Sequence, residues 1–257
     1  MYSNYIFDLY GTLVDINTDE DSTDFWYKLS LFYSYKGAKY SAKELKEMYI
    51  KKVNDFKATL KDTLYPDFPL EIIFKELYED KDIIPSTDLV NDTAHLFRAL
   101  STKYVKLYDG AIELLELLKK KNKRIYLLSN AQRIFTLYEM RILGIEKYFD
   151  DIFFSADYKV CKPDSTFYNN LIEKYNIDVK KSIMIGNDYI ADILINGTGE
   201  EIKNIKYDCG GNILFNYLPK NHAMKFYCDK CNILVSLHKM IKKPNFVRIY
   251  GNSNMNG

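Results

Sequence analysis

Four short apolar runs, each ending at a polar residue or glycine, constrain the fold of this chain most strongly. These runs are residues 5–7 before Asp8, 125–128 before Ser129, 152–154 before Ser155 and 183–185 before Gly186. Runs of this length and composition are typical of buried parallel strands. Helical patterns lie between them, and the clearest covers residues 109–121, where Asp109 is expected to cap the helix. Strands alternating with helices predict an α/β fold with a doubly wound parallel sheet.

Residues 16–105 interrupt this alternation. They contain amphipathic helical stretches at residues 41–60 and 87–104 and turn signals at three prolines. We therefore expect a core domain formed by residues 1–15 and 106–200, with an inserted α-helical cap domain at residues 16–105. Residues 201–257 are richer in Asn, Lys, Tyr and Gly and have weak helical periodicity, so they are either the end of the core or an irregular tail.

Composition excludes several classes of function. The 36 Lys and Arg residues against 35 Asp and Glu residues give a net charge of +1, which does not favour nucleic acid as a partner. No apolar run approaches the roughly 18 residues that cross a bilayer, so no membrane partner is expected. The four cysteines do not form the pattern of a disulfide framework. The sequence favours a cytoplasmic protein with a small-molecule substrate, and it is silent on oligomeric state.

The polar residues that follow the strands suggest a reactive site. Parallel strands place their carboxyl ends at one edge of a sheet, where ligands bind, so these residues are expected to converge. At the first strand, Asp8 supplies a carboxylate that can attack an electrophile, Gly11 permits a tight turn and Thr12 supplies a hydroxyl. At the second strand, Ser129 and Asn130 can hold an anion, although in isolation a helix cap is the better interpretation of that pair.

Two further segments complete the candidate site. Lys162 precedes Pro163 and a helix that Asp164 is expected to cap, so its ammonium could offset negative charge at Asp8. Asn187, Asp188 and Asp192 follow the fourth strand. Clustered oxygen side chains beside Asp8 suit a hard cation such as Mg²⁺, because carboxylates crowded together repel unless a cation neutralises them.

In order along the chain, Asp8-Leu9-Tyr10-Gly11-Thr12, Ser129-Asn130, Lys162-Pro163 and the segment GNDYIAD resemble the four motifs of the haloacid dehalogenase (HAD) superfamily of hydrolases. The resemblance implies a Rossmann-like core with a helical cap between the first two motifs. It implies that Asp8 forms a covalent aspartyl intermediate, that Thr12 and Ser129 hold the transferring group and that Lys162 stabilises its charge. It places Mg²⁺ on Asp8, on the backbone carbonyl of Tyr10 and on Asn187 or Asp188, and it matches Asp192 to the second acid of the fourth motif.

Tyr10 departs from the pattern of the superfamily's phosphatases. These enzymes usually carry a second aspartate two residues after the nucleophile, and that aspartate protonates the leaving oxygen and then activates water. A positioned general acid accelerates a reaction by roughly 10²–10⁴, and a phenol of pKa about 10 is a poor base near neutrality. Efficient hydrolysis of phosphate monoesters is therefore in question.

Tyrosine at this position resembles the haloacid dehalogenases, whose halide leaving group needs no proton and whose reaction needs no metal. Those enzymes also have a Trp-Arg segment near the start of the cap, where this chain has Lys28, and they lack the acidic fourth motif. We therefore predict a Mg²⁺-dependent phosphatase acting on a small organic phosphate. The alternatives are a metal-independent 2-haloacid dehalogenase and a catalytically weakened binding protein of the same fold.

The C-terminal segment offers one separate hypothesis. Cys209, His222, Cys228 and Cys231 could supply four tetrahedral ligands to zinc. One Cys-x-x-Cys pair with loosely spaced partners is a weak signal, and reduced, partly buried thiols are the simpler interpretation.

Overall fold

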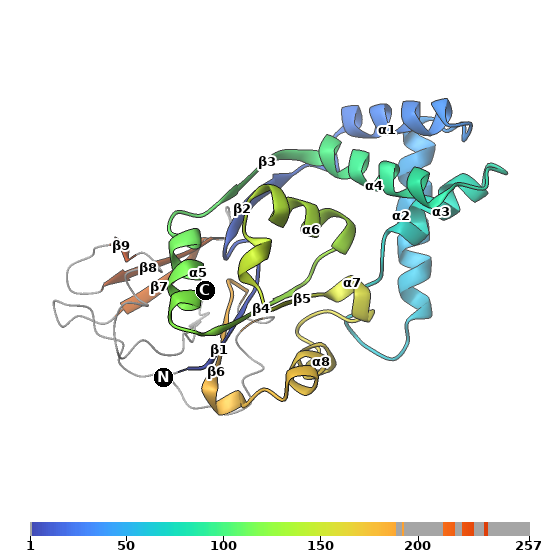
Figure 1. Ribbon diagram of the computed structural model, residues 1–257. Helices are drawn as coiled ribbons and strands as arrows, with labels where there is room; N and C mark the ends of the chain where they lie inside the picture. The colour runs from blue at the N-terminus through green and yellow to red at the C-terminus, as the bar shows by residue number, and fades with distance from the viewer. Residues whose placement is uncertain (1, 189–191, 193–212, 219–222, 229–233, 236–257) are drawn as a thin grey trace, which may run out of the picture.

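The structure is a computed structural model that describes residues 2–188, 192, 213–218, 223–228 and 234–235 (Figure 1). The helices are α1 Thr23–Tyr35, α2 Ala42–Thr59, α3 Glu71–Glu79, α4 Thr87–Ser101, α5 Ala111–Lys120, α6 Arg133–Ile142, α7 Ser155–Tyr158 and α8 Ser165–Tyr175, with 3-10 turns η1 Glu146–Tyr148 and η2 Val179–Lys181. The strands are β1 Asn4–Phe7, β2 Val14–Thr18, β3 Thr102–Leu107, β4 Arg124–Ser129, β5 Asp151–Phe154, β6 Ser182–Ile185, β7 Ile213–Leu218, β8 Ala223–Cys228 and β9 Leu234–Val235.

The four apolar runs form the central sheet. Its strand order is β5-β4-β1-β6, and every neighbouring pair is parallel. The chain moves outward from β1 through β4 to β5 and then returns to place β6 on the other side of β1. The connections therefore reverse direction at β1, which is the place where open α/β sheets bind ligands. The predicted doubly wound α/β fold is confirmed.

Helices cover both faces of this sheet because alternate strand residues point to opposite sides. On one face, Phe7 and Leu127 pack with the apolar side of α5 and with Met140 of α6. On the other face, Ile6 and Leu128 pack with α8 (Figure 1). Each fully buried Leu or Phe side chain contributes about 1.5–3 kcal/mol to the free energy of unfolding, so these two layers fix the register of the strands.

One detail of α5 differs from the sequence prediction. Asp109 does not cap this helix, because the residue at the N-cap is Gly110, which has a φ of 85°, and no side chain caps the first turn. The left-handed conformation at Gly110 turns the chain directly into the helix, and few residues other than glycine adopt it readily. The expected buried face of the helix is present, since Ala111, Leu115 and Leu118 are all buried.

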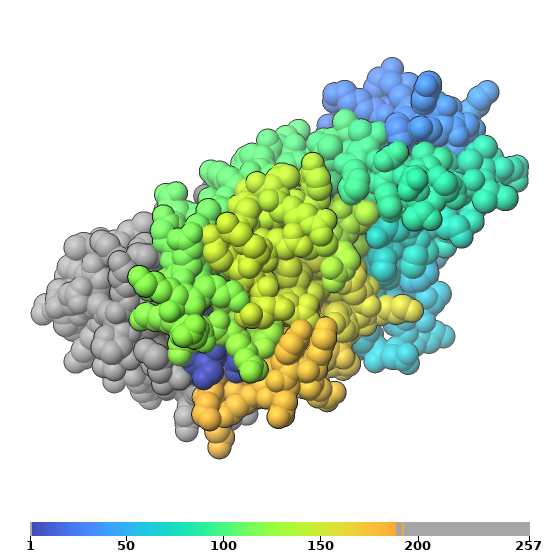
Figure 2. All heavy atoms as spheres, viewed as in Figure 1, coloured from blue at the N-terminus to red at the C-terminus, as the bar shows by residue number. Residues whose placement is uncertain are grey.

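Helices α1 to α4 lie between β2 and β3 and project to one side of the sheet (Figure 2). They form most of a hydrophobic cluster that is rich in aromatic residues, including Trp26, Phe74 and Phe97, and that Phe135 of α6 completes. Ser41 begins α2 with a reciprocal capping box to Glu44, as the sequence of a Ser followed by a Glu three residues later favours. β2 and β3 pair antiparallel, so a two-stranded ribbon joins these helices to the sheet.

The same helices also contact the core away from the ribbon. Pro66 forms an isolated antiparallel bridge with Val160, and the backbone N–H of Cys161 donates to the carbonyl of Tyr65 (2.9 Å). The side chain of Gln132, which precedes α6, accepts from the N–H of Leu70 at 2.9 Å and donates to the carbonyl of Phe68 at 3.0 Å. The loop between α2 and α3, residues 60–70, is therefore fastened to the core beside the segment that carries Lys162.

β7, β8 and β9 form a separate antiparallel sheet of three strands, of which the backbone is described. Among the described helices, none combines the length and the apolar character that a membrane span requires.

Candidate active site

Asp8 is the first residue after the central strand β1, at the point where the sheet's connections reverse direction. Its N–H donates to the carbonyl of Ile185 on β6 (2.8 Å), which holds it at the carboxyl edge of the sheet. The chain then turns tightly, because the carbonyl of Leu9 accepts from three successive N–H groups and Gly11 takes a φ of 77°. A β-carbon at Gly11 would lie 2.4 Å from the amide nitrogen of Asn187, so only glycine fits this approach.

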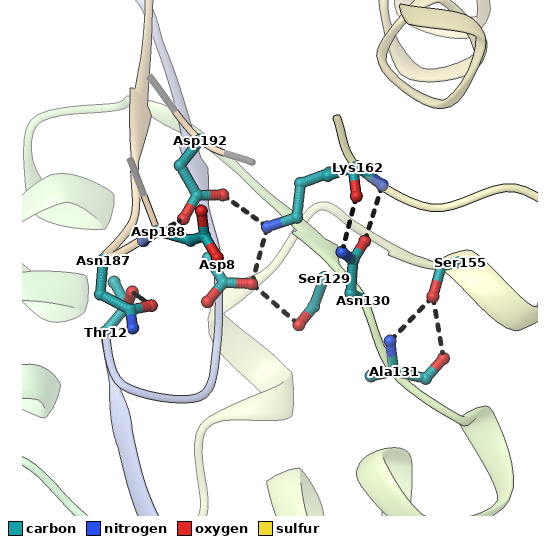
Figure 3. Close-up of polar contacts among 10 residues, drawn as sticks. All are labelled: Asp8, Thr12, Ser129, Asn130, Ala131, Ser155, Lys162, Asn187, Asp188 and Asp192. Atoms are coloured by element: carbon teal, nitrogen blue, oxygen red, sulfur yellow. Dashed lines mark hydrogen bonds and ion pairs between the residues drawn. The ribbon is translucent and has the colours of Figure 1, made fainter. Parts of the chain in front are cut away.

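Lys162 lies between two carboxylates. Its Nζ is 2.8 Å from Oδ1 of Asp8 and 2.6 Å from Oδ1 of Asp192 (Figure 3). The hydroxyl of Ser129, at the end of β4, donates to the same Oδ1 of Asp8 at 3.0 Å. Lys162 and Ser129 both bind Oδ1 of Asp8. Neither of these bonds involves the other carboxylate oxygen, Oδ2, which is therefore the candidate for attack on a substrate.

The cluster is deeply buried, which strengthens its electrostatics. The side chains of Lys162, Asp192 and Asp8 are 2%, 1% and 10% exposed. Burial alone would lower the pKa of Lys162, but the charges of Asp8 and Asp192 outweigh burial and raise it. Burial raises the pKa of Asp192 to about 6, against the opposing charge of Lys162. Lys162 is therefore held as an ammonium whose charge two acids share.

The loop that carries Lys162 is held by Asn130. The amide of Asn130 accepts from the backbone N–H of Lys162 (2.8 Å) and donates to its carbonyl (3.0 Å). Asp164 then caps α8 through the N–H of Thr166, as the sequence predicts. Ser129 and Asn130 do not cap a helix, because α6 begins after Gln132. In this structure they contact Asp8 and Lys162 instead.

The segment after β6 places its three polar residues differently. Asn187 accepts from the hydroxyl of Thr12 (3.2 Å), so these two side chains pair beside Asp8 (Figure 3). The charges of Asp192, Asp8 and Asp188 all act on Tyr168 of α8, so the carboxylate of Asp188 belongs to the same region of the site. Oδ2 of Asp192 accepts from the backbone N–H of Asp188 (3.0 Å). The same carboxylate packs against Gly186, where a β-carbon would lie only 2.0 Å from Oδ2.

The side chain of Tyr10 has partners outside this cluster. Its hydroxyl donates to the carboxylate of Glu139 and lies 3.0 Å from the hydroxyl of Thr136, both on α6. Arg98 of α4 donates to the Tyr10 oxygen (3.2 Å) and forms a buried ion pair with Glu139 (2.6 Å). Burial, followed by the charge of Glu139, raises the pKa of Tyr10 above its usual value. The phenol is thus kept protonated at the contact between α4 and α6.

Sequence reasoning missed Glu139 and Arg98. Glu139 occupies an inward position of α6, on the same face as Phe135 and Met140, and an acid at an apolar position of a helical pattern indicates a buried charge that needs a cation. It also missed Tyr168 of α8. Burial, then the charges of Asp192 and Asp8, raise the pKa of Tyr168, so its ring lies within electrostatic reach of the cluster.

Some residues singled out from the sequence lie elsewhere. Ser155, which follows β5, contacts Asp67 and accepts from the N–H of Ala131 (2.9 Å) rather than approaching Asp8. Lys28 forms an exposed ion pair with Asp24 on α1. The zinc hypothesis lies outside the described residues for Cys209, His222 and Cys231. For Cys228, only the strand that contains it, β8, is described.

The oxygen side chains near Asp8 fit a cation such as Mg²⁺, which needs few protein ligands, better than a metal whose ligands are all protein side chains. In the described part of the chain, no group of three or more His, Cys, Asp or Glu side chains could hold a metal ion. Mg²⁺ commonly binds through one or two carboxylates and completes its shell with water and substrate oxygens. Asp8 and Asp188 provide two carboxylates in this region, and Asp192 and Asn187 contact Lys162 and Thr12.

Several solved structures match this chain at low sequence identity. The candidate HAD-hydrolase YfnB from Bacillus subtilis, solved bound to magnesium, is 18% identical over 75% of this chain and 82% of its own, with a TM-score of 0.41. The L-2-haloacid dehalogenase from Xanthobacter autotrophicus is 16% identical over 74% and 72% (TM-score 0.41). A candidate β-phosphoglucomutase from Thermotoga maritima is 21% identical over 71% and 74% (TM-score 0.40). No curated protein matches the sequence.

The sequence pattern of one family covers most of the chain. The haloacid dehalogenase-like hydrolase family matches residues 2–195, which include all four motifs and the helices between β2 and β3. This match confirms the resemblance inferred from the motifs. The chain belongs to the haloacid dehalogenase-like hydrolase family.

Proposed function

We propose that the protein is a Mg²⁺-dependent phosphatase that acts on a small organic phosphate through an aspartyl-phosphate at Asp8. The observation that carries this proposal is the position of Lys162, whose single charge is shared between Asp8 and Asp192. An anionic phosphoryl group at Asp8 would need more positive charge than a shared ammonium supplies. A divalent cation beside Asp8 meets that need, and a metal-independent reaction does not.

The described side chains suggest a role for each residue. Oδ2 of Asp8 attacks phosphorus while Lys162 and Ser129 hold Oδ1 and orient the carboxylate. Lys162 and Ser129 then lie where they can stabilise the negative charge of the transferring oxygens, which is the main source of catalysis in phosphoryl transfer. Thr12, paired with Asn187, borders the same site, and Asn130 positions Lys162.

Mg²⁺ would be held by the carboxylates of Asp8 and Asp188 and by the backbone carbonyl of Tyr10. When bound, it would supply a Lewis acid that neutralises phosphoryl oxygens. Asp192 would position Lys162 and Asp188 rather than bind the metal, because it already contacts both. Asn187, whose oxygen accepts from Thr12, is the weaker candidate of the two alternatives for the fourth motif.

The helical region supports the role of a cap. Residues 16–105 form most of a hydrophobic cluster that is distinct from those of the sheet, with Phe135 of α6 as its member outside this range. The ribbon of β2 and β3 joins these residues to a core proposed to comprise residues 1–15 and 106–200. Such an insertion would cover the site and select a small-molecule substrate. Cys161, a free thiol, fits the proposed cytoplasmic setting, since thiols stay reduced there.

A trapping experiment tests the nucleophile. Beryllofluoride with Mg²⁺ should form a complex on Asp8 that ¹⁹F NMR detects, and Asp8→Asn should abolish it. Asp15→Asn is the matched control, because Asp15 lies on β2 and pairs with Lys106 outside the site. Full turnover of small phosphates by Asp8→Asn would overturn the proposal. The absence of any complex in the wild type would instead favour a binding protein of this fold.

One observation favours a second candidate, the 2-haloacid dehalogenase. The hydroxyl of Tyr10 donates to Glu139, and a halide leaving group needs no proton. A panel of small phosphates and 2-haloacids, each assayed with Mg²⁺ and with EDTA, separates the two activities. Halide released from 2-chloropropionate in EDTA would show a dehalogenase, whereas phosphate released only with Mg²⁺ would show a phosphatase.

A further inference from the structure

The hydroxyl at Tyr10 is committed to a contact away from the reacting carboxylate. It donates to Glu139, and Glu139 is itself fixed by two bonds from Arg98, at 2.6 and 3.3 Å. The Glu139 side chain is 7% exposed and that of Arg98 is 17% exposed, so water does not compete freely for these bonds. A general acid must lie within hydrogen-bond reach of the atom that it protonates. Tyr10 is therefore not placed to protonate a leaving oxygen at Asp8.

Three further proton-bearing side chains around Asp8 also donate to protein groups. Ser129 donates to Asp8, Thr12 donates to Asn187, and Lys162 donates to both Asp8 and Asp192. Each of these bonds holds the nucleophile or its neighbours in place. Within the part of the site that the structure describes, the groups that stabilise charge are present, but these bonds direct no side-chain proton at a departing oxygen.

We propose that this site accepts phosphoryl groups only from substrates whose leaving group departs as a stable anion, namely aryl and acyl phosphates. This inference rests on the proposed phosphatase function. Oδ2 of Asp8 forms a bond to phosphorus, the bond between phosphorus and the leaving oxygen breaks, and that oxygen leaves with the electron pair as a phenolate or carboxylate. No proton is required for this step, whereas an alkoxide leaving group requires one.

The same geometry slows the second step. Water attacks the phosphorus of the aspartyl-phosphate, the bond from phosphorus to Asp8 breaks, the carboxylate is restored, and the proton from water passes to solvent. Because Tyr10 is held by Glu139, it does not accept this proton. The phosphorylated form of Asp8 therefore accumulates during turnover.

A series of leaving groups measures both effects on the wild-type protein. With Mg²⁺, p-nitrophenyl phosphate and acetyl phosphate should react, and ethyl phosphate should have a kcat/KM lower by more than about 10³, since the aid of a general acid is worth roughly 10²–10⁴. A burst of nitrophenolate, approaching one per protein, should precede the steady state, and mass spectrometry should find the phosphoryl group on Asp8. Comparable kcat/KM values for ethyl and p-nitrophenyl phosphate would overturn the inference.

Two variants sharpen the result. Tyr10→Phe removes only the hydroxyl, and the ratio of aryl to alkyl rates should stay the same; a selective loss of alkyl phosphate turnover would identify the phenol as the acid and contradict the inference. Tyr10→Asp introduces a carboxyl group at the position where related phosphatases have one, and it should raise alkyl turnover and shrink the burst. If Asp8 takes up no phosphoryl group from any donor, the proposed function itself fails, and this outcome is distinct from the others.

Discussion

Two buried ionic clusters of this molecule differ in their balance of charge. At the edge of the sheet, one ammonium, Lys162, is shared by Asp8 and Asp192. At the contact between α4 and α6, one guanidinium, Arg98, meets one carboxylate, Glu139, with the phenol of Tyr10 beside them. The first cluster carries more negative than positive side-chain charge, and the second is neutral.

This difference separates a reactive site from a structural contact. A neutral, hydrogen-bonded cluster satisfies its own groups and has little to gain from a ligand, because its donors and acceptors are already matched. A cluster with surplus carboxylate gains when a cation binds, because the added positive charge reduces the repulsion between the acids. The side chain of Tyr10 belongs to the second cluster although Asp8, two residues earlier in the chain, belongs to the first.

The strongest test of this comparison removes the shared cation. Lys162→Met should lower the free energy of unfolding by about 3–5 kcal/mol, because two carboxylates lose their buried partner. Urea titration monitored by the fluorescence of the single Trp26 measures the change. Adding Asp8→Asn to Lys162→Met should restore part of the loss, and a double variant as unstable as the single one would contradict the idea that excess carboxylate is the cause.

A matched pair of charge removals compares the clusters directly. Glu139→Gln should cost about 1.5–3 kcal/mol of unfolding free energy, since Arg98 loses a charged hydrogen-bond partner. Asp8→Asn makes the same chemical change in the cluster with surplus acid, so it should leave the unfolding free energy unchanged or raise it. Thermal and urea unfolding measure both variants. Equal losses of stability in Glu139→Gln and Asp8→Asn would show that the two clusters do not differ in the way proposed.

The loop between α2 and α3, which contacts the core, should make stability depend on pH. Burial raises the pKa of Asp67 above its usual value, so the folded state binds its proton more tightly than the unfolded state does. The stability gained from that proton is complete below the unfolded pKa and is lost as pH rises through the folded pKa. Asp67→Asn should therefore gain stability relative to wild type as pH rises above the unfolded pKa of about 3.9, with a slope no steeper than about 1.4 kcal/mol per pH unit. Urea titrations across this range measure it, and a slope of opposite sign would contradict the burial of Asp67.

The smallest effect is expected far from both clusters. Ser41→Ala removes the capping box of α2 and should cost about 1 kcal/mol. Thr59→Ala is the control, because its hydroxyl bonds only within the last turn of the same helix. If thermal unfolding of Ser41→Ala affects the helical region alone, hydrogen exchange will show α1 to α4 opening before the sheet.

The sequence predicted the sheet well because the signal of its four strands is local. Each strand is a short apolar run, and the rule that parallel strands end at a common edge then brings Asp8 and Ser129 together without knowledge of any contact. Lys162 and Asp192 were also predicted from their positions in the sequence. Lys162 comes just before a predicted helix, and Asp192 comes after the fourth strand. The resemblance to the superfamily added roles for these residues but not their hydrogen-bond partners.

The contacts of Tyr10 could not be predicted, because they depend on how helices pack rather than on any local pattern. Glu139 is separated from Tyr10 by 129 residues, and Arg98 lies in the helical region. Only the packing of α4 on α6 brings the three together. The prediction that Asp109 caps α5 was wrong for a related reason. The preference of aspartate for the N-cap is weak compared with the left-handed turn that Gly110 makes there.

The pairing of Pro66 with Val160 has a mechanical consequence. Residues 65–67 and 159–161 share two backbone hydrogen bonds, and Lys162 follows directly. A swing of the four helices about their ribbon would have to break those bonds or pull the ammonium away from its two acids. One short stretch of backbone thus couples the position of the helical region to the position of the Lys162 ammonium.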